Sequence, residues 1–252
     1  MDRLTLKRSG QVLAPSLFTM GNMACGFYSL LASSRGDFTA AATAILGGVV
    51  CDMLDGRVAR MVHGESSFGV EFDSLSDFLT FGVAPASMVY AFILKDYGVI
   101  GGLSAFLFAL CGGLRLALFN VSSQSGSGSK THFQGLPIPA GAGFWASFIL
   151  LYQILEEQKP ARTLAPLMRE VPFLLTLVPF LMVGLAFLMV STIPYAAFKQ
   201  KEMFRVQNPR LLGLVALGLA LVYFYPQNAI FLLVLIYVLS GFFGILSGSR
   251  KD

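Results

Sequence analysis

The sequence contains few charged residues for its length. Only 13% of its 252 residues are Asp, Glu, Lys or Arg, whereas 55% are hydrophobic, and the mean hydropathy is +0.70. Because a soluble domain is usually about 25% charged, this composition excludes an ordinary water-soluble globular protein. It also offers no basic soluble domain that could bind nucleic acid. A lipid bilayer is the environment that the composition predicts.

Cysteine is also scarce, and its placement excludes a zinc-type site. The three cysteines, Cys25, Cys51 and Cys111, fall in separate apolar segments without metal-ligand spacing. We therefore expect free thiols that pack between helices. Residues 1–15 lack an apolar core followed by a cleavage site, so we expect no cleavable signal peptide there. The same residues predict a short N-terminal interfacial segment.

Long apolar runs dominate the rest of the chain. A membrane-spanning helix needs roughly 20 mostly apolar residues, and eight windows approach that length. These windows cover residues 16–34, 38–62, 72–94, 98–120, 137–155, 172–197, 210–226 and 228–248. The sequence therefore predicts an all-α integral membrane protein with about eight transmembrane helices.

The distribution of basic residues predicts the orientation of these helices. With eight spans, most of the 18 Lys and Arg residues fall on the side of the N-terminus. Cytoplasmic loops carry the excess of Lys and Arg in membrane proteins, so we expect both termini in the cytoplasm. The net charge of +4 then predicts attraction to anionic lipid head groups.

Four carboxylates interrupt the second and third apolar windows. Asp52 and Asp55 lie near the end of the second window, and Asp73 and Asp77 near the start of the third. Each charge at membrane depth costs about 2.5–3.5 kcal/mol on insertion scales, so such residues indicate function by default. Taken singly, an Asp at a helix end is more often a helix cap or a solvated residue than a functional one.

Helical spacing predicts that the four carboxylates meet. Asp52, Asp55 and Ala59 follow i, i+3, i+7, and Gly69, Asp73 and Asp77 follow i, i+4, i+8, so each set lines one helix face. If the faces oppose, the carboxylates repel one another strongly at reduced dielectric. Hard divalent cations such as Mg or Mn prefer oxygen ligands of this kind. A pair of metal ions is the simplest compensation.

Small and basic residues surround the carboxylates. Gly56, Gly69 and Ala59 allow a nucleotide or pyrophosphate to approach the helix backbones, and Arg60 can neutralise phosphate oxygens. The glycines alone could instead serve close helix packing. The whole pattern reads D-x2-D-G-x2-A-R-x8-G-x3-D-x3-D, and its chance match is on the order of 10⁻⁹ per starting point. Its positions are Asp52, Asp55, Gly56, Ala59, Arg60, Gly69, Asp73 and Asp77.

This pattern is identified as the signature of the CDP-alcohol phosphotransferase family. The resemblance implies a six-helix membrane core with an active site that holds two divalent metal ions and releases CMP. We accordingly expect a core at residues 16–197 and a C-terminal transmembrane hairpin at 198–252, after the interfacial segment at 1–15. The expected metal ligands are Asp52, Asp55, Asp73 and Asp77, and the expected CDP-lipid-binding residues are Gly56, Ala59, Arg60, Gly69 and Asn22.

The flanking residues resemble the serine phosphatidyltransferase branch of the family. The similarity lies in residues 67–86, in 15–22 and in 114–121 followed by 135–140. It implies CDP-diacylglycerol and L-serine as substrates, Asp77 as the base that takes the serine proton, and a homodimer in the cell inner membrane with its active site facing the cytoplasm.

Two further residues are candidates for binding the acceptor. Arg115 offers a bidentate guanidinium for the serine carboxylate, although it could equally neutralise a lipid phosphate or pair with an Asp. Asn120, like Asn22, is a polar group at membrane depth that could bind substrate or form an interhelical bond.

Two alternatives stay open from the residues. The acceptor could be glycerol 3-phosphate, inositol phosphate or choline, or the donor an ether-linked archaeal CDP-lipid. A cation-coupled transporter also fits apolar spans with carboxylates. The transporter is disfavoured because the acidic cluster lies at one membrane face and the 52–77 pattern has no second copy.

Overall fold

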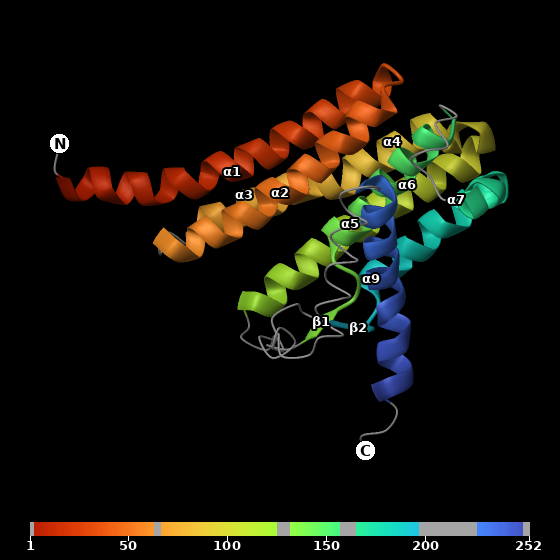
Figure 1. Cartoon of the computed structure of the whole chain (residues 1–252). Coiled ribbons are helices and arrows are strands. Elements are labelled where there is room, and N and C mark those ends of the chain that lie inside the picture. The colour runs from red at the N-terminus through yellow and green to blue at the C-terminus, as the bar shows by residue number, and fades with distance from the viewer. Residues whose placement is uncertain (1–2, 63–66, 125–131, 157–164, 197–225, 249–252) are drawn as a thin grey trace, which may run out of the picture.

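The computed structural model describes residues 3–62, 67–124, 132–156, 165–196 and 226–248 (Figure 1). Its α-helices are α1 (Arg3–Ser34), α2 (Phe38–Val62), α3 (Ser67–Asp77), α4 (Ala84–Phe92), α5 (Gly98–Gln124), α6 (Ile138–Glu156), α7 (Ala165–Val190) and α9 (Pro226–Gly248). A π-helix, η1 (Phe78–Val83), joins α3 to α4, and a 3-10 helix, η2 (Leu94–Tyr97), precedes α5. The predicted helical class is confirmed. The seventh predicted window, 210–226, falls almost wholly outside the described residues, so the count of eight is untested.

Several helix boundaries differ from the predicted windows. The helix α1 runs unbroken from Arg3, so residues 3–15 continue the first predicted span. The window at 172–197 was wrong at both ends, because α7 begins at Ala165 and ends at Val190. A helix can continue past the apolar slab through charged residues, which hydropathy counts as a break. The α7 helix ends shortly before Pro194, in keeping with the extended conformation that the residue before a proline prefers.

Three helical stretches within the described residues are long and apolar enough to cross a membrane. They are Phe38–Val58, Phe68–Phe92 and Leu94–Ser122. Large apolar side chains such as Val99, Phe106 and Phe187 point outward and are more than half exposed. Lipid tails solvate such side chains as well as a protein core does. The protein is therefore an integral membrane protein.

The first two helices form a long antiparallel hairpin. The α1 and α2 helices lie side by side in Figure 1 and pack along their length. Gly36 makes the turn with a φ of 79°, and the Asp37 carboxylate caps α2 by accepting a hydrogen bond from the Ala40 backbone N–H at 2.9 Å. This hairpin and α3 carry the acidic residues of the motif.

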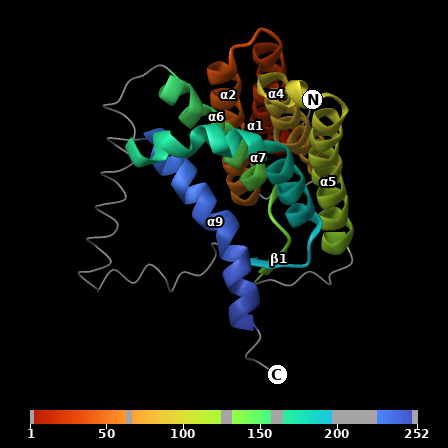
Figure 2. The same cartoon turned by 90° about the vertical axis from the view of Figure 1, so that its right-hand side faces the viewer.

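The α6 helix forms the centre of the molecule. Between Gly141 and Leu151 its described side chains are buried on every side. It packs against α2, α7, α9 and the π-helix, and α9 crosses the other helices obliquely (Figure 2). Phe144, Trp145 and Phe148 form an aromatic cluster with Phe231 of α9. The buried helix thereby joins the motif helices to the C-terminal helix.

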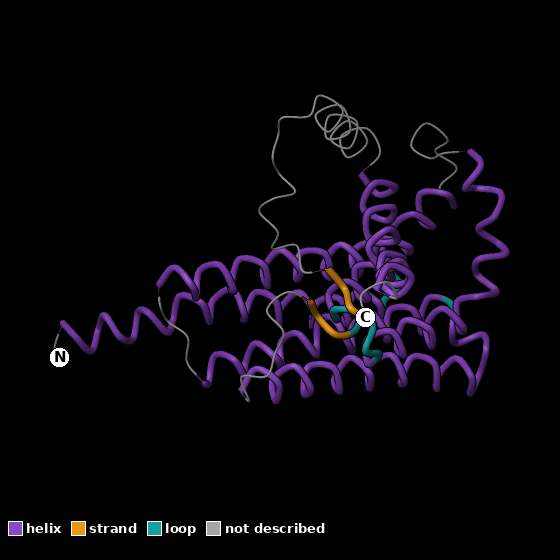
Figure 3. Tube along the Cα trace, turned by 90° about the horizontal axis from the view of Figure 1, so that it is seen from below, coloured by secondary structure: helices purple, strands orange, loops and turns teal. Residues whose placement is uncertain are grey.

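A short strand pair closes the segment that contains α6 and α7. The strands β1 (His132–Gln134) and β2 (Pro194–Ala196) pair antiparallel, with Phe133 opposite Tyr195 (Figure 3). The Gly135 and Leu136 backbone N–H groups add bonds to the Ile193 and Leu188 carbonyls, both at 2.9 Å. The strands therefore tie the start of α6 to the end of α7.

The π-helix directly follows the last residue of the acidic motif. The Ala84 N–H bonds to the Leu79 carbonyl, five residues earlier, and Pro85 comes next. Proline has no N–H and clashes with the carbonyl four residues before it, which here is that of Phe81. The wider turn accommodates this proline within a continuous helical run. Thr80, within this π-helix, is fully buried.

Glycines let two helices, α1 and α2, approach Thr80 of the π-helix closely. A Cβ added to Gly26 of α1 would lie 2.8 Å from the Thr80 Cα, and one added to Gly48 of α2 would lie 2.5 Å from its Cγ2. Both contacts are shorter than carbon atoms tolerate. The two glycines therefore permit the approach that brings α1 and α2 against the π-helix directly after α3.

The substitution Gly26→Ala should destabilise the protein. Its methyl group meets the backbone of Thr80, which cannot rotate away, so we expect an overpacking cost of about 1–3 kcal/mol and a fall in the melting temperature of roughly 2–10 °C. Thermal unfolding of the purified variant in detergent measures this. Gly184→Ala in α7 is the matched control, because nothing lies within 4 Å of its added Cβ. Equal melting temperatures for the two variants would contradict the close approach.

Candidate active site

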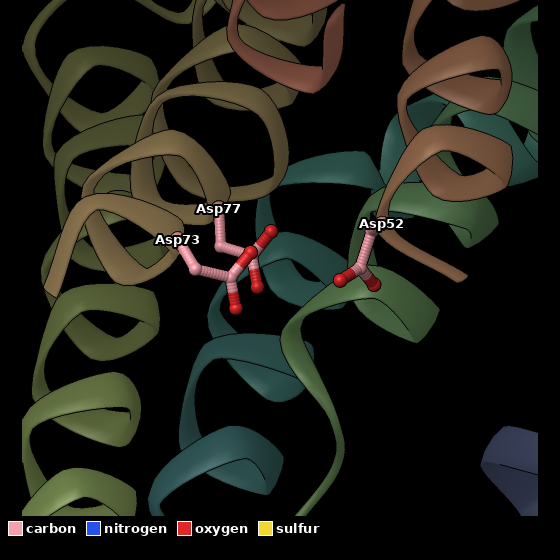
Figure 4. A group of neighbouring side chains, drawn as sticks. All are labelled: Asp52, Asp73 and Asp77. Carbon is pink, nitrogen blue, oxygen red and sulfur yellow. The ribbon is translucent and has the colours of Figure 1, made fainter. Parts of the chain in front are cut away.

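Three carboxylates converge between α2 and α3. One oxygen each from Asp52, Asp73 and Asp77 lies within 4.8 Å of the others. Figure 4 shows Asp73 and Asp77 projecting from the same side of one helix, with Asp52 facing them from another. The prediction that the two acidic helix faces oppose is confirmed for these three residues.

Asp55 occupies a neighbouring position. Its side chain is buried, and one carboxylate oxygen accepts a hydrogen bond from the Thr19 hydroxyl of α1. Its charge acts on Asp73 and Asp77, so it belongs to the same electrostatic environment. It is not among the three carboxylates within 4.8 Å of one another. The role of Asp55 as a metal ligand stays a prediction.

The carboxylate cluster suits a divalent cation. Two unit charges 4.8 Å apart repel by about 3–4 kcal/mol at an effective dielectric constant of 20. The Oδ1 atom of Asp73 is buried and has no hydrogen-bond partner in the part of the chain that the structure describes. A hard cation would satisfy this oxygen and remove the repulsion, because its preferred ligands are oxygens. The residues present therefore fit the metal that the motif implies.

The small residues of the motif lie at the ends of the same two helices. Gly56 is exposed on α2, and Gly69 is half-buried near the start of α3. Ala59 and Arg60 belong to the last turns of α2, but their side chains lie outside the described residues. The expectation that these four residues bind CDP-lipid stays a prediction.

The first helix contributes a polar face that sequence reasoning largely missed. Thr19 donates to Asp55, and its own backbone carbonyl accepts a hydrogen bond from the Ser76 hydroxyl at 3.0 Å. Asn22 Nδ2 donates to Asp77 Oδ1 at 2.8 Å, and the Asn22 carbonyl accepts from Thr80 at 2.8 Å. The available signal was the recurrence of polar residues, Thr19 and Asn22, three positions apart in an apolar window.

This arrangement bears on the expectation that Asn22 binds CDP-lipid. Its side chain is fully buried, with 0% exposure, and its amide faces Asp77. In this conformation Asn22 offers no surface to a lipid substrate. The observed contact is with a carboxylate of the motif.

The two acceptor candidates both lie on α5 but have different neighbours. Asn120 Nδ2 donates to the Ser74 hydroxyl at 2.9 Å, which links α5 to α3 beside Asp73. Arg115 is half-buried and interacts electrostatically with Tyr237 of α9. The C-terminal helix therefore reaches the residue that was predicted to bind the acceptor carboxylate.

The substitution Asp73→Asn should weaken divalent metal binding. It removes one charge and one oxygen ligand from the cluster, so we expect the Mn²⁺ dissociation constant to rise at least about tenfold. Electron paramagnetic resonance of free Mn²⁺ in a detergent titration measures this. Glu71→Gln is the matched control, because Glu71 is exposed on the same helix. If both variants bound Mn²⁺ as tightly as the original protein, the cluster would not be a metal site.

Comparisons with known proteins agree with this geometry. Residues 12–178 match the family described as CDP-alcohol phosphatidyltransferase, and this range includes the whole acidic motif. A CDP-diacylglycerol–serine O-phosphatidyltransferase of Helicobacter pylori is 34% identical over 232 residues, which cover 91% of this chain and 89% of that protein.

Shorter matches extend to other domains of life. An archaetidylserine synthase of Methanothermobacter thermautotrophicus is 42% identical over 144 residues, covering 55% of this chain and 58% of that protein. A CDP-diacylglycerol–serine O-phosphatidyltransferase of Saccharomyces cerevisiae is 41% identical over 133 residues, covering 48% of each chain. Because the family match covers about two thirds of its length and includes the motif whose carboxylates converge, the chain belongs to the CDP-alcohol phosphatidyltransferase family.

Proposed function

We propose that this protein transfers the phosphatidyl group of CDP-diacylglycerol to the hydroxyl of L-serine, giving phosphatidylserine and CMP. The observation that carries the proposal is that Asp52, Asp73 and Asp77, which belong to the family motif, converge in space. Its acceptor is supported by the relative from Helicobacter pylori, which is named for serine and matches along nearly the whole chain.

The carboxylates would hold the metal ions of the reaction. Asp52, Asp73 and Asp77 are the ligands that the geometry favours, with Asp55 beside them. Bound there, two Mg or Mn ions would neutralise the pyrophosphate oxygens and stabilise the charge on departing CMP. The small Gly56, Gly69 and Ala59 would leave room for the nucleotide, and Arg60 would bind a phosphate oxygen.

The protein's own residues would then position and deprotonate the acceptor. Asp77 takes the proton of the serine hydroxyl while the serine oxygen forms a bond to the phosphorus that carries diacylglycerol. The bond between that phosphorus and the bridging oxygen of CMP breaks, and CMP leaves with the electron pair. The burial of Asp77, with 8% exposure, keeps competing water away from this step.

The acceptor carboxylate would bind on α5. Arg115 is half-buried within a membrane-spanning helix, where charged residues usually serve a function such as substrate binding. Its planar guanidinium suits bidentate binding of serine. Asn120 would join α5 to α3 on the same helix as Arg115, through its hydrogen bond to the Ser74 hydroxyl.

The membrane placement follows from the same proposal. The active site and both termini would face the cytoplasm of the cell inner membrane, where serine and CDP-lipid meet. The proposal also includes a homodimer formed through spanning helices, as the family resemblance implies.

An acceptor panel tests the proposed reaction directly. Purified protein should release CMP from CDP-diacylglycerol with L-serine at least about tenfold faster than with glycerol 3-phosphate, inositol phosphate or choline, because a site built around a carboxylate partner rejects alcohols that lack one. A second donor arm with an ether-linked CDP-lipid identifies the lipid preference, which the archaetidylserine synthase relative makes worth measuring. Chelation by EDTA should abolish turnover, and Mg²⁺ or Mn²⁺ should restore it. Faster release with another alcohol would contradict serine as the acceptor.

The substitution Arg115→Leu should raise the KM for serine more than the KM for CDP-diacylglycerol. Losing the guanidinium removes the carboxylate contact, so we expect the serine KM to rise at least about tenfold while the KM for CDP-diacylglycerol changes less than about threefold. Steady-state kinetics in mixed micelles measures both constants. Arg35→Leu is the control, because Arg35 is exposed in the turn between α1 and α2. Equal changes in the two KM values would argue against serine recognition by Arg115.

A further inference from the structure

Hydrogen bonds hold both the side chain and the backbone carbonyl of Asn22. Its side-chain amide donates to Asp77 Oδ1 at 2.8 Å, and its backbone carbonyl accepts a hydrogen bond from the Thr80 hydroxyl at 2.8 Å. Thr80 is itself held where Gly26 and Gly48 allow α1 and α2 to approach it. The packing of α1, α2, α3 and the π-helix therefore sets the position of the Asn22 amide relative to Asp77.

The same arrangement repeats one turn earlier on α1. Thr19 donates its hydroxyl to Asp55 and accepts a hydrogen bond from Ser76 on its backbone carbonyl. Thr19, Asn22 and Gly26 follow i, i+3, i+7, so one face of α1 makes all of these contacts. One carboxylate of each motif helix, Asp55 of α2 and Asp77 of α3, thus has one oxygen held by α1.

The unpaired oxygen of Asn22 argues against a purely structural role. Asn22 Oδ1 is buried, faces Gly48 and has no hydrogen-bond partner among the described residues. A buried oxygen without a partner lowers stability, and an apolar side chain of the same size would avoid that loss. The benefit of an amide at this position is therefore its N–H group, and that group points to Asp77.

We propose that Asn22 is a positioning residue for Asp77, a proposal that rests on the proposed function. The terminal torsion of an aspartate is broad and roughly two-fold, so the carboxylate plane is poorly fixed by its own rotamer. The amide occupies Oδ1 and fixes that plane. The second oxygen of Asp77 is thereby left to the cation or to the serine hydroxyl.

The substitution Asn22→Leu tests this role, because leucine has a similar volume and no N–H donor. We expect kcat to fall about 10- to 100-fold and the Mn²⁺ dissociation constant to rise about tenfold, which are the effects of removing a partner that orients a ligand. The dissociation constant for CMP should change less than about threefold. A tenfold weaker affinity for CMP would instead make Asn22 a nucleotide-binding residue and overturn the proposal.

The matched control is Ser33→Ala, which removes a buried hydrogen bond within the same helix, from the Ser33 hydroxyl to the Ser29 carbonyl, and leaves the Asn22 amide and Asp77 in contact. It should lower the melting temperature because a buried hydrogen bond is lost, while kcat and Mn²⁺ affinity stay within about threefold of the original protein. Equal losses of both quantities in the two variants would assign Asn22 a structural role only. If Asn22→Leu does not fold, Asn22→Ala supplies the same comparison.

A double-variant cycle shows whether Asn22 acts through Asp77. In an Asp77→Asn background, adding Asn22→Leu should change Mn²⁺ affinity by less than about twofold, because the carboxylate that it orients is already gone. A further tenfold loss would show that Asn22 acts independently and would overturn the proposal. The Mn²⁺ measurement needs no acceptor, so it remains informative if serine proves not to be the substrate.

Discussion

Mutual repulsion among acidic side chains is the constraint on which the site depends. Asp52, Asp73 and Asp77 lie within 4.8 Å of one another, and their charges would drive α2 and α3 apart. The α1 helix opposes this separation with uncharged donors, Thr19 and Asn22, that bond to Asp55 and Asp77. Such donors stabilise ionised carboxylates without cancelling their charge, so the cluster keeps its attraction for a cation.

Helix packing converts the spacing of the acidic residues in the sequence into this geometry. The motif places its acidic residues on two helix faces, but only the approach of α1, α2 and the π-turn around Thr80 fixes how those faces meet. The α6 helix packs against α2 and the π-helix, and its aromatic residues also contact α9. Through Tyr237, α9 reaches Arg115, which gives the C-terminal helix a place beside the proposed acceptor site.

Periodicity and motif spacing predicted the acidic face well, and for a physical reason. The spacing of Asp73 and Asp77 by four residues places both side chains on one side of α3 in any regular helix. The bounds of α2 match the predicted window 38–62, because the polar residues Asp37 and His63 to Ser67 flank it on either side.

The contacts around this face could not be predicted in the same way. Thr19, Ser76 and Thr80 contribute through bonds to other helices, which hydropathy does not register. The π-turn depends on Pro85 within a helix that continues past it, whereas proline usually indicates an end. Asn22 was recognised as a polar residue at membrane depth, but its partner became visible only when α1 was placed against α3.

The backbone carbonyls of α1 fix its position along its own axis. Ser76 and Thr80 bond to the carbonyls of Thr19 and Asn22, while the side chains of those two residues hold carboxylates. A slide of α1 by one residue is a movement of about 1.5 Å, and it would break all four bonds together. These bonds therefore fix the register of α1 against α3 and the π-helix, and this register keeps Thr19 and Asn22 opposite the carboxylates that they contact.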